Sequence, residues 1–254
     1  MLEVYRRFYE EDLAIPVVAG VKSESERFAG AQDTYSVEAL MQDGRALQAG
    51  TSHFLGQHFA KVFDITFLDR DGQRKHGWQT SWGVSTRSIG AIVMVHGDDA
   101  GLMLPPKIAP IQVVIVPIYK NDAEKKAVYE MVDEIEAALH EHVRVHVDRR
   151  EEQTPGWKYN EWELRGVPVR LEIGPRDVKQ EKVVLVRRDT LAETMYRRLP
   201  KGKQGWTLSD GGTAATGRIV HAAVENQELL VDPDLTAPNA AISTRIAVTL
   251  AEDY

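Results

Sequence analysis

A nearly unbroken apolar run, residues 111–118, constrains the fold of this chain more than any other segment. Such a run is typical of a strand that is buried on both faces, as the strands of parallel sheets are. The periodicity of residues 121–141 then predicts a helix, with Asn121 and Glu124 at the spacing of a capping box. Residues 143–148 alternate between apolar and polar side chains and predict a second strand. The order strand, helix, strand predicts a βαβ unit.

The same pattern continues downstream of this unit. A further helix is expected over residues 157–165, ended by Gly166, and strands are expected over residues 167–173 and 183–187. The helix over 121–141 presents one apolar face, made of Val128, Met131, Val132, Ile135 and Leu139. Together these elements predict an α/β domain.

A proline-rich segment, residues 102–110, precedes the α/β pattern. Each proline fixes its own φ and restricts the residue before it, so we expect this segment to be extended and stiff. We place the domain boundary here, with domains over 1–108 and 109–190. Residues 191–254 form a divergent C-terminal segment with turn signals near Asp210 and Pro233, and we assign no chemistry to it.

Upstream of the boundary, the pattern predicts an antiparallel sheet with helices. The turn signal Asp43–Gly44 joins two alternating segments into a hairpin. The expected elements are a helix over 2–13, strands over 15–20, 34–40 and 45–53, a helix over 54–63, a strand over 64–68 and a turn over 69–72.

Residues 79–98 carry the marks of a helix start and stop. Ser85 and Thr86 are suited to cap exposed N–H groups, and Gly97 is suited to end the helix. A helix N-terminus favours anions, and Arg87 in the first turn adds a fixed cation, so we expect a candidate anion site. Most capped helices with an early arginine bind no nucleotide, and the signal is modest by itself. The face expected to pack on the sheet comprises Ile89, Ile92, Val93 and His96.

The second strand of the hairpin is expected to carry a functional face. Gly50 has no side chain and permits close approach of a ligand or of another backbone, next to Gln48 and Thr51. His53 lies at the strand end beside hydroxyl groups. A single histidine there is more often a surface or core residue than a ligand contact.

Composition excludes several classes of protein. The 254 residues include no cysteine, which rules out disulfides and thiolate metal sites and fits a reducing, cytoplasmic setting. The formal net charge of −7 argues against non-specific coating of nucleic acid. No apolar run approaches the length of a membrane span.

Positive charge and aromatic rings are nevertheless concentrated between residues 149 and 188. Such a combination is able to grip single-stranded RNA by stacking, although a solvated charged face is the commoner explanation. A metal site at the three nearby histidines is discounted, because they straddle a helix end and a strand and no fourth ligand is evident. The residues concerned are Arg149, Arg150, Lys158, Arg165, Arg170, Arg176, Lys179, Lys182, Arg187 and Arg188 with Trp157, Tyr159 and Trp162, and the histidines are His140, His142 and His146.

Three stretches, in order, closely resemble one family. Residues 48–53 read Gln-Ala-Gly-Thr-Ser-His, residues 81–87 read Ser-Trp-Gly-Val-Ser-Thr-Arg, and the long stretch 154–177 is the most specific. Together they resemble prolyl-tRNA synthetases of the archaeal and eukaryotic-like type, from about Leu2 to Thr190. The resemblance implies an antiparallel-sheet class II synthetase core, of which 1–108 is the C-terminal portion, followed by an α/β anticodon-binding domain with a mixed sheet.

The resemblance also implies an activity and partners. A proline–tRNA ligase uses ATP, which enters with Mg²⁺, to form prolyl-adenylate, and it then moves the prolyl group to the terminal ribose of proline tRNA. Carboxylate attack on the α-phosphate needs orientation and charge neutralisation more than a covalent catalyst. By position, the implied ATP-binding residues are Gln48, Thr51, Ser85, Thr86 and Arg87, with Arg87 also catalytic. The implied proline-binding residues are Phe28, Trp82 and His53, and the candidates for reading the anticodon are Lys158, Glu163 and Arg165.

Departures from the family pattern set further expectations. The first signature motif of the class, the Thr-x-Glu proline loop and the arginine of the second motif are expected upstream of Met1. The family homodimer is built largely from that part, so dimerisation is left open for this chain. The C-terminal segment matches the zinc-binding-like domain of the family poorly, and we expect no zinc.

Two other readings remain open beside a proline–tRNA ligase. One is a non-catalytic tRNA-binding or regulatory module that keeps the anticodon domain and has lost proline activation. The other is a truncated, partly folded product with no role of its own, which would melt without cooperativity.

Overall fold

The structure, a computed structural model, describes residues 1–191, 193–198 and 206–208 of the chain. The chain forms two compact units, Met1–Val95 and a second unit from His96 onward. The first is built on an antiparallel sheet and the second on a mixed sheet.

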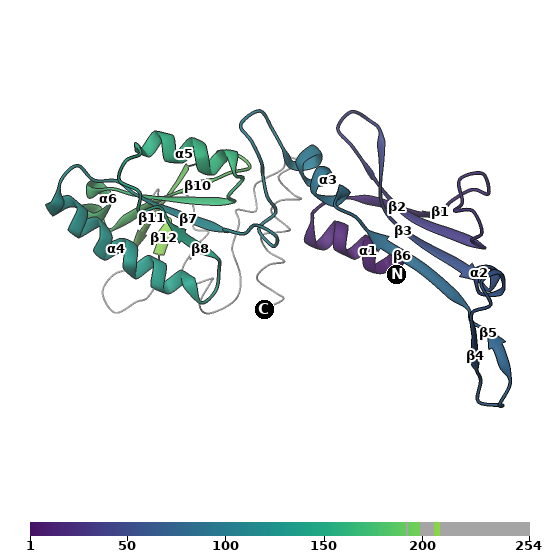
Figure 1. The fold of residues 1–254 in the computed structure, drawn as a ribbon. Helices are drawn as coiled ribbons and strands as arrows, with labels where there is room; N and C mark the ends of the chain where they lie inside the picture. Colours follow the sequence, from purple (N-terminus) through teal and green to yellow (C-terminus); the bar gives the residue numbers. More distant parts are fainter. Residues whose placement is uncertain (192, 199–205, 209–254) are drawn as a thin grey trace. The chain divides into compact units, whose positions relative to one another are not determined.

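The first unit contains an antiparallel sheet with the strand order β1-β2-β3-β6 (Figure 1). Its strands are β1 (Val17–Val21), β2 (Asp33–Leu40), β3 (Ala46–Gly56) and β6 (Gln79–Val84). The predicted hairpin between β2 and β3 is confirmed, and its turn contains Gly44 with φ +79°, a left-handed conformation that glycine adopts without a Cβ clash.

An N-terminal helix packs on one face of this sheet. The predicted helix over 2–13 is confirmed as α1 (Leu2–Arg7) and a π-helical continuation, η1 (Phe8–Asp12). The ring of the fully buried Tyr9 points inward, and its hydroxyl donates to the carbonyl oxygen of Ala49 over 2.7 Å. A Cβ at Gly50 would lie 3.2 Å from the Tyr5 ring. The glycine predicted to allow close approach therefore makes room for α1.

Two predictions for the first unit are wrong in part. The helix expected over 54–63 is only α2 (His58–Val62), because Phe54 still pairs with Asp33 and Thr80 at the end of β3. The helix that begins at Arg87 is confirmed as α3 (Arg87–His96), but Ile89 and Val93 are exposed.

The face of α3 that packs inward is a different one. Ala91 is fully buried, and Ser88 lies 3.1 Å from the Tyr9 hydroxyl. The small side chains of this face therefore lie toward Tyr9 of η1, and the bulkier Ile89 and Val93 point away.

A separate two-stranded hairpin extends from the first unit. It joins β4 (Thr66–Leu68) to β5 (Arg74–His76) through the predicted turn at 69–72, in which Gly72 has φ +76° (Figure 1). Lys75 on β5 forms ion pairs with Asp69 and Asp71, which close the turn.

The second unit is built on a six-stranded mixed sheet with the order β12-β11-β10-β9-β7-β8. The parallel strands are β7 (Val113–Pro117), β8 (Val145–Val147) and β9 (Val169–Ile173), and the antiparallel strands are β10 (Lys182–Arg187), β11 (Glu193–Arg198) and β12 (Trp206–Leu208). The predicted strands over 111–118, 143–148, 167–173 and 183–187 are confirmed.

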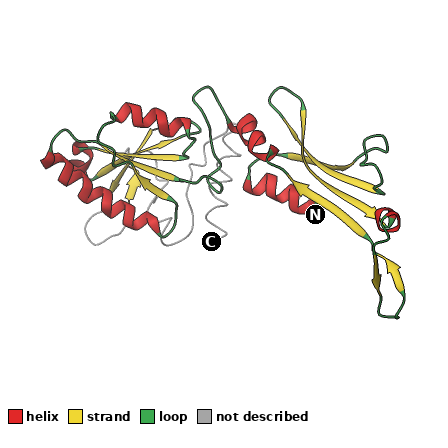
Figure 2. Ribbon diagram, viewed as in Figure 1, coloured by secondary structure: helices red, strands yellow, loops and turns green. Residues whose placement is uncertain are grey.

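Helices cover both faces of this sheet, as Figure 2 shows. On one face lies α4 (Asp122–His140), and on the other α5 (Pro155–Leu164). A shorter helix, α6 (Pro175–Gln180), was not predicted. Alternate residues of β7 point to opposite faces of the sheet and belong to two hydrophobic clusters. Ile115 packs in the cluster under α4, whereas Val114 and Val116 pack with Trp162 of α5. The central strand is thus buried on both faces, as its apolar run predicts.

The start and the face of α4 follow the sequence. The Asn121 side chain accepts a hydrogen bond from the Glu124 N–H over 2.9 Å, and the Glu124 carboxylate accepts from the Lys120 N–H over 2.9 Å. The five apolar residues predicted to face the sheet are all buried: Val128, Met131, Val132, Ile135 and Leu139.

The proline-rich segment packs along the second unit. The N–H of Leu102 donates to the Leu164 carbonyl oxygen and that of Leu104 to the Gly166 carbonyl oxygen, each over 3.1 Å. Arg144 donates to the carbonyl oxygens of Ala109, Pro106 and Lys107. These contacts explain why the compact units divide at Val95 and not near residue 108.

The predicted functional boundaries of the domains stay a prediction. Of the segment 191–254, β11 and β12 were missed by the sequence analysis. The turns expected near Asp210 and Pro233 lie outside the described residues. Among the helices that are described, none combines the length and apolarity needed to cross a membrane.

Truncation of Leu139, which is 3% exposed in the core under α4, is expected to destabilise the second unit. The Leu139→Ala variant should lose roughly 2–5 kcal/mol of unfolding free energy, because it loses apolar burial and leaves a cavity. The matched control is Leu164→Ala on α5, where the side chain is 62% exposed and the loss should stay below about 1 kcal/mol. Chemical denaturation of both variants checks this, and equal losses would contradict the described core.

Candidate functional site

One face of the first sheet carries a connected set of polar side chains. Strand register places Thr34 opposite His53 and Ser36 opposite Thr51. A bulge between Val37 and Glu38 shifts the pairing so that Glu38 lies opposite Gln48. We call this set the polar face: Lys22, Thr34, Ser36, Glu38, Gln48, Thr51 and His53.

His53 is fixed by neighbours on this face. Its Nδ1 lies 2.9 Å from the Thr34 hydroxyl oxygen, and the Phe28 ring packs against the imidazole with 4.9 Å between ring centroids. The backbone N–H of Phe28 also donates to the Thr34 hydroxyl over 3.2 Å. Burial lowers the pKa of His53, and the positive charge of Lys22 lowers that pKa further. The ring is therefore held in its neutral form near neutral pH.

Arg87 lies beside the same strand. Its guanidinium Nη1 donates to the Gln48 carbonyl oxygen over 3.0 Å, and its backbone N–H donates to the Ser85 hydroxyl over 3.3 Å. The carbonyl oxygen of Thr86 accepts from the Ile89 N–H in the first turn of α3. Capping by Ser85, expected from the sequence, is present. Thr51 on β3 pairs with Gly83 on β6. Because Gly83 has no side chain, the space beside Thr51 on that strand is open.

Trp82 is placed differently from the other predicted proline-binding residues. It pairs with Ser52, whereas His53 pairs with Ser81, and successive side chains on a strand point to opposite faces. The structure brings Phe28 and His53 together but leaves Trp82 on the other face, 54% exposed. The binding roles assigned to all these residues stay predictions.

Four members of the polar face were not predicted from the sequence: Lys22, Thr34, Ser36 and Glu38. Thr34 and Glu38 alternate with apolar residues on a strand that was predicted correctly. Counting residues outward from the hairpin turn would have indicated which residues of β3 lie opposite them. Glu38 lies opposite Gln48 because of the bulge, which could not be predicted from the residue pattern.

In the second unit, a buried carboxylate organises the residues around α5. Asp148 directly follows β8 and is fully buried. It accepts hydrogen bonds from the Arg150 guanidinium at 2.9 and 2.7 Å and from the Trp162 indole at 2.9 Å. Burial by itself raises the pKa of Asp148, but these hydrogen bonds outweigh burial and hold that pKa well below its usual range.

The three candidate anticodon residues differ in exposure. Lys158 is buried, and its ammonium donates to the Asp148 carbonyl oxygen over 3.1 Å. The Glu163 carboxylate accepts from Arg170 over 2.7 Å. Arg165 is the most exposed of the three, with its guanidinium bonded to Glu161.

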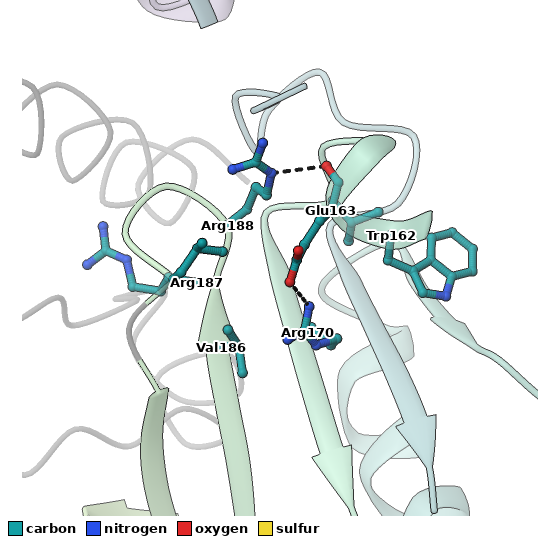
Figure 3. A pocket seen from close by; sticks show the side chains of 8 residues that line it. Trp162, Glu163, Arg170, Val186, Arg187 and Arg188 are labelled. Atoms are coloured by element: carbon teal, nitrogen blue, oxygen red, sulfur yellow. Dashed lines mark hydrogen bonds and ion pairs between the residues drawn. The ribbon is translucent and has the colours of Figure 1, made fainter. Parts of the chain in front are cut away.

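A pocket lies beside Glu163 (Figure 3). Glu163 points its carboxylate toward Arg170, and its carbonyl oxygen accepts from Arg188 over 3.0 Å. Arg188 also forms an ion pair with Asp98. The pocket is lined by Trp162, Glu163, Val167, Arg170, Val186, Arg187, Arg188 and Leu191.

Much of the positive charge expected to face RNA is neutralised within the second unit. The residues with carboxylate partners are Arg149, Arg150, Lys158, Arg165, Arg170, Arg187 and Arg188. Of the three aromatic residues, Trp157 is 45% exposed, with the Arg150 guanidinium 5.2 Å from its ring centroid, whereas Trp162 is buried. Ion pairing, and not a broad basic patch, therefore accounts for most of this charge.

The three histidines considered as metal ligands have separate surroundings. His146 packs against Trp162, with ring centroids 5.1 Å apart. Within the described ranges, no group of three or more histidine, aspartate or glutamate side chains is arranged to hold a metal ion.

Comparisons with known proteins agree with this architecture. Residues 112–198 match the family described as "Anticodon binding domain". The chain is 62% identical over 198 residues to a proline–tRNA ligase of Natranaerobius thermophilus and 60% identical over 187 residues to that of Chloroflexus aggregans. Over the matched residues the chain is similar to proline–tRNA ligases.

A solved structure extends this relationship to the fold. The structure of prolyl-tRNA synthetase from Cryptosporidium parvum, complexed with L-proline and AMP, is 46% identical and superimposes with a TM-score of 0.72, over 76% of this chain and 42% of that one. The predicted fold class, a class II antiparallel sheet followed by an α/β anticodon-binding domain, is thereby confirmed. The matches cover 78% and 74% of this chain, but it spans only about two fifths of these curated relatives, 41% and 39%.

His53 is expected to titrate below the ordinary histidine pKa of about 6.5. Because the pKa is lower in the folded state, the contribution of His53 to unfolding free energy is complete above that value. It is lost as pH falls toward the folded-state pKa. An NMR titration of the ring C–H resonances, assigned with His53→Gln, measures the pKa. A value at or above the ordinary one would contradict the described surroundings.

Loss of the Asp148 charge is expected to destabilise the second unit. At neutral pH, Asp148→Asn should lower the free energy of unfolding by roughly 3–5 kcal/mol, because Arg150 and Lys158 lose their buried partner. The pKa of Asp148 is depressed by folding, so this stability is present above about pH 4 and is lost as the pH falls further.

Denaturation of the native chain and the Asp148→Asn variant between pH 7 and pH 3 tests this, and the difference should shrink at the acidic end. Asp133→Asn is the control, since Asp133 pairs with Arg149 at the surface and should contribute below about 1 kcal/mol. A pH-independent difference for Asp148→Asn would refute the role of its charge.

Proposed function

We propose that this chain carries nucleotide-binding, proline-binding and tRNA-binding parts of a proline–tRNA ligase. The observation that carries the proposal is the polar face with Arg87 beside it, in a chain similar to a synthetase solved with L-proline and AMP. The reaction is ATP-dependent activation of proline followed by transfer to tRNA, in the cytoplasm.

In the first step, a carboxylate oxygen of proline attacks the α-phosphorus of ATP. A new P–O bond forms, the bond to the β-phosphate breaks, and pyrophosphate leaves with Mg²⁺ that entered with ATP. Arg87 supplies fixed positive charge for the nucleotide, at the start of α3, where the free N–H groups of the helix also favour an anion. We assign Gln48, Thr51, Ser85 and Thr86 to the same ligand.

Proline is assigned to the wall formed by Phe28 and His53. The tilted contact between their rings gives an apolar surface of the kind that packs against a pyrrolidine ring. Neutral His53, held by Thr34, places no second positive charge beside the secondary ammonium of proline. Trp82 has no comparable support, because it lies on the opposite face of the sheet.

Transfer requires that tRNA be held, and we assign this role to the second unit. In this step a hydroxyl of the terminal ribose attacks the prolyl carbonyl carbon, and AMP leaves. The anticodon is assigned to the face of α5, with Arg165 making direct contact through its exposed guanidinium. Lys158 and Glu163 support that face through Asp148 and Arg170.

A second function is distinguished by ligand binding. A non-catalytic tRNA-binding module would bind proline tRNA but not ATP. The ion-paired, mostly neutralised surface around α5 fits selective contact with a few bases better than binding by charge alone. Both functions would use this ion-paired surface, so only a measurement of ATP binding distinguishes them.

Separate titrations of ATP and of labelled proline tRNA test the proposal at one fixed salt concentration. The native chain is expected to bind both. Arg87→Gln should weaken ATP binding by about tenfold or more, because a charge-assisted contact contributes roughly 1.5–3 kcal/mol, and it should leave tRNA affinity within about twofold. Arg165→Gln should show the reverse pattern.

Each variant thus serves as the control for the other. Binding of tRNA without ATP would favour the non-catalytic module, and binding of neither ligand by a folded chain would refute both functions. Proline-dependent exchange of pyrophosphate into ATP by the purified chain would add direct support for the activation step.

A further inference from the structure

Lys22 occupies an enclosed position at the edge of the polar face. It follows β1 directly, and its backbone N–H donates to the Thr34 carbonyl oxygen over 2.8 Å, which extends the pairing with β2. Its side chain is only 15% exposed. The ammonium donates to the Gln48 side-chain oxygen Oε1 over 2.6 Å. The short hydrogen bond to the neutral Gln48 amide, together with the low exposure of the side chain, fixes the position of the Lys22 ammonium.

The charges around Lys22 argue against direct binding of an anion. Its Nζ lies 3.8 Å from a Glu26 oxygen and 3.9 Å from a Glu38 oxygen, so two carboxylates offset the single positive charge. Glu38 in turn accepts from the Ser36 hydroxyl over 2.9 Å, which fixes one of these carboxylates. A phosphate near Lys22 would meet net negative charge. Arg87, by contrast, makes its described bond to a neutral carbonyl group.

Gln48 is held by cations at both ends. Arg87 binds its backbone carbonyl oxygen, and Lys22 binds its side-chain oxygen. This double contact falls where the regular ladder is interrupted, because Glu38 pairs with Gln48 and Val37 with Gly50, and Ala49 between them on β3 has no partner in the register. Because Oε1 is engaged by Lys22, the amide nitrogen Nε2 is the end left to face a ligand.

We propose that Lys22 is a positioning residue that fixes the Gln48 amide, with Nε2 directed toward the phosphate or hydroxyl oxygens of the nucleotide. This proposal rests on the proposed function for its ligand, but the orientation of Gln48 is a property of the ligand-free chain. Lys22 acts through Gln48 and does not touch the nucleotide itself. Fixing one donor in advance reduces the entropy lost on binding.

The test compares three variants of the full chain. Lys22→Met removes the ammonium and keeps a long apolar stem, whereas Lys22→Arg keeps a donor and a charge. The matched control is Lys126→Met, because Lys126 is an exposed lysine on α4 in the other unit. Circular dichroism confirms that each variant is folded.

Two measurements are made on each variant. The first is the position of the Gln48 side-chain NH₂ resonances in the ligand-free chain, assigned with Gln48→Ala. The second is the dissociation constant for ATP by calorimetry. Lys22→Met is expected to shift the Gln48 resonances and to weaken ATP binding about tenfold. Lys22→Arg should restore ATP affinity to within about threefold, and Lys126→Met should change neither quantity.

Unshifted Gln48 resonances in Lys22→Met would overturn the proposal, whatever happens to ATP. Shifted resonances with unchanged ATP affinity would also overturn it, because Gln48 would then be oriented without effect on the nucleotide. If the native chain binds no ATP, the proposed function fails and the nucleotide role of Lys22 fails with it. In that case the resonances still decide whether Lys22 orients Gln48.

Discussion

The pairing of β2 with β3 is the constraint on which the candidate site depends. The turn at Gly44 sets which residues of the two strands lie opposite each other, and the bulge at Val37 and Glu38 shifts that pairing by one residue. A slip by a single residue would send every side chain of β3 to the other face. Thr34 would then lose His53, and Lys22 would lose Gln48. The chemistry of this unit is therefore specified by backbone hydrogen bonds before any side chain contributes.

The second unit relies on a different interaction. Asp148 is buried without access to water, and its hydrogen bonds from Arg150 and Trp162 join the end of β8 to helix α5. Because a buried carboxylate is stable only with such partners, the network specifies how α5 packs on the sheet. The RNA contact that we propose for α5 would be made by a helix whose packing this network already fixes.

The sequence predicted those features that depend on local periodicity. The apolar run of β7, the inward face of α4 and the end of α5 just before Gly166 follow from spacing and turn chemistry, and the structure confirms them. The resemblance assigned Arg87 and Gln48 to one ligand, and the Arg87 guanidinium lies on the Gln48 carbonyl oxygen. Features that depend on distant contacts were missed: the bulge that aligns Glu38 with Gln48, and the exposure of Ile89, which reflects the close approach of Ser88 and Ala91 to their neighbours. A helical face is visible in a sequence, but the choice between two apolar faces is made by the surface against which they pack.

The proline-rich segment has a consequence for how the second unit is isolated. Its backbone donates to Leu164 and Gly166, and a Cβ at Gly166 would lie 2.7 Å from the Leu102 backbone, so the segment fits closely against the end of α5. The family match begins only at residue 112. In a shortened chain that begins at residue 112, the carbonyl groups of Leu164 and Gly166 and the Arg144 guanidinium would lose their hydrogen-bond partners. The compact second unit therefore begins at His96, well before residue 112, where the match to the family model begins.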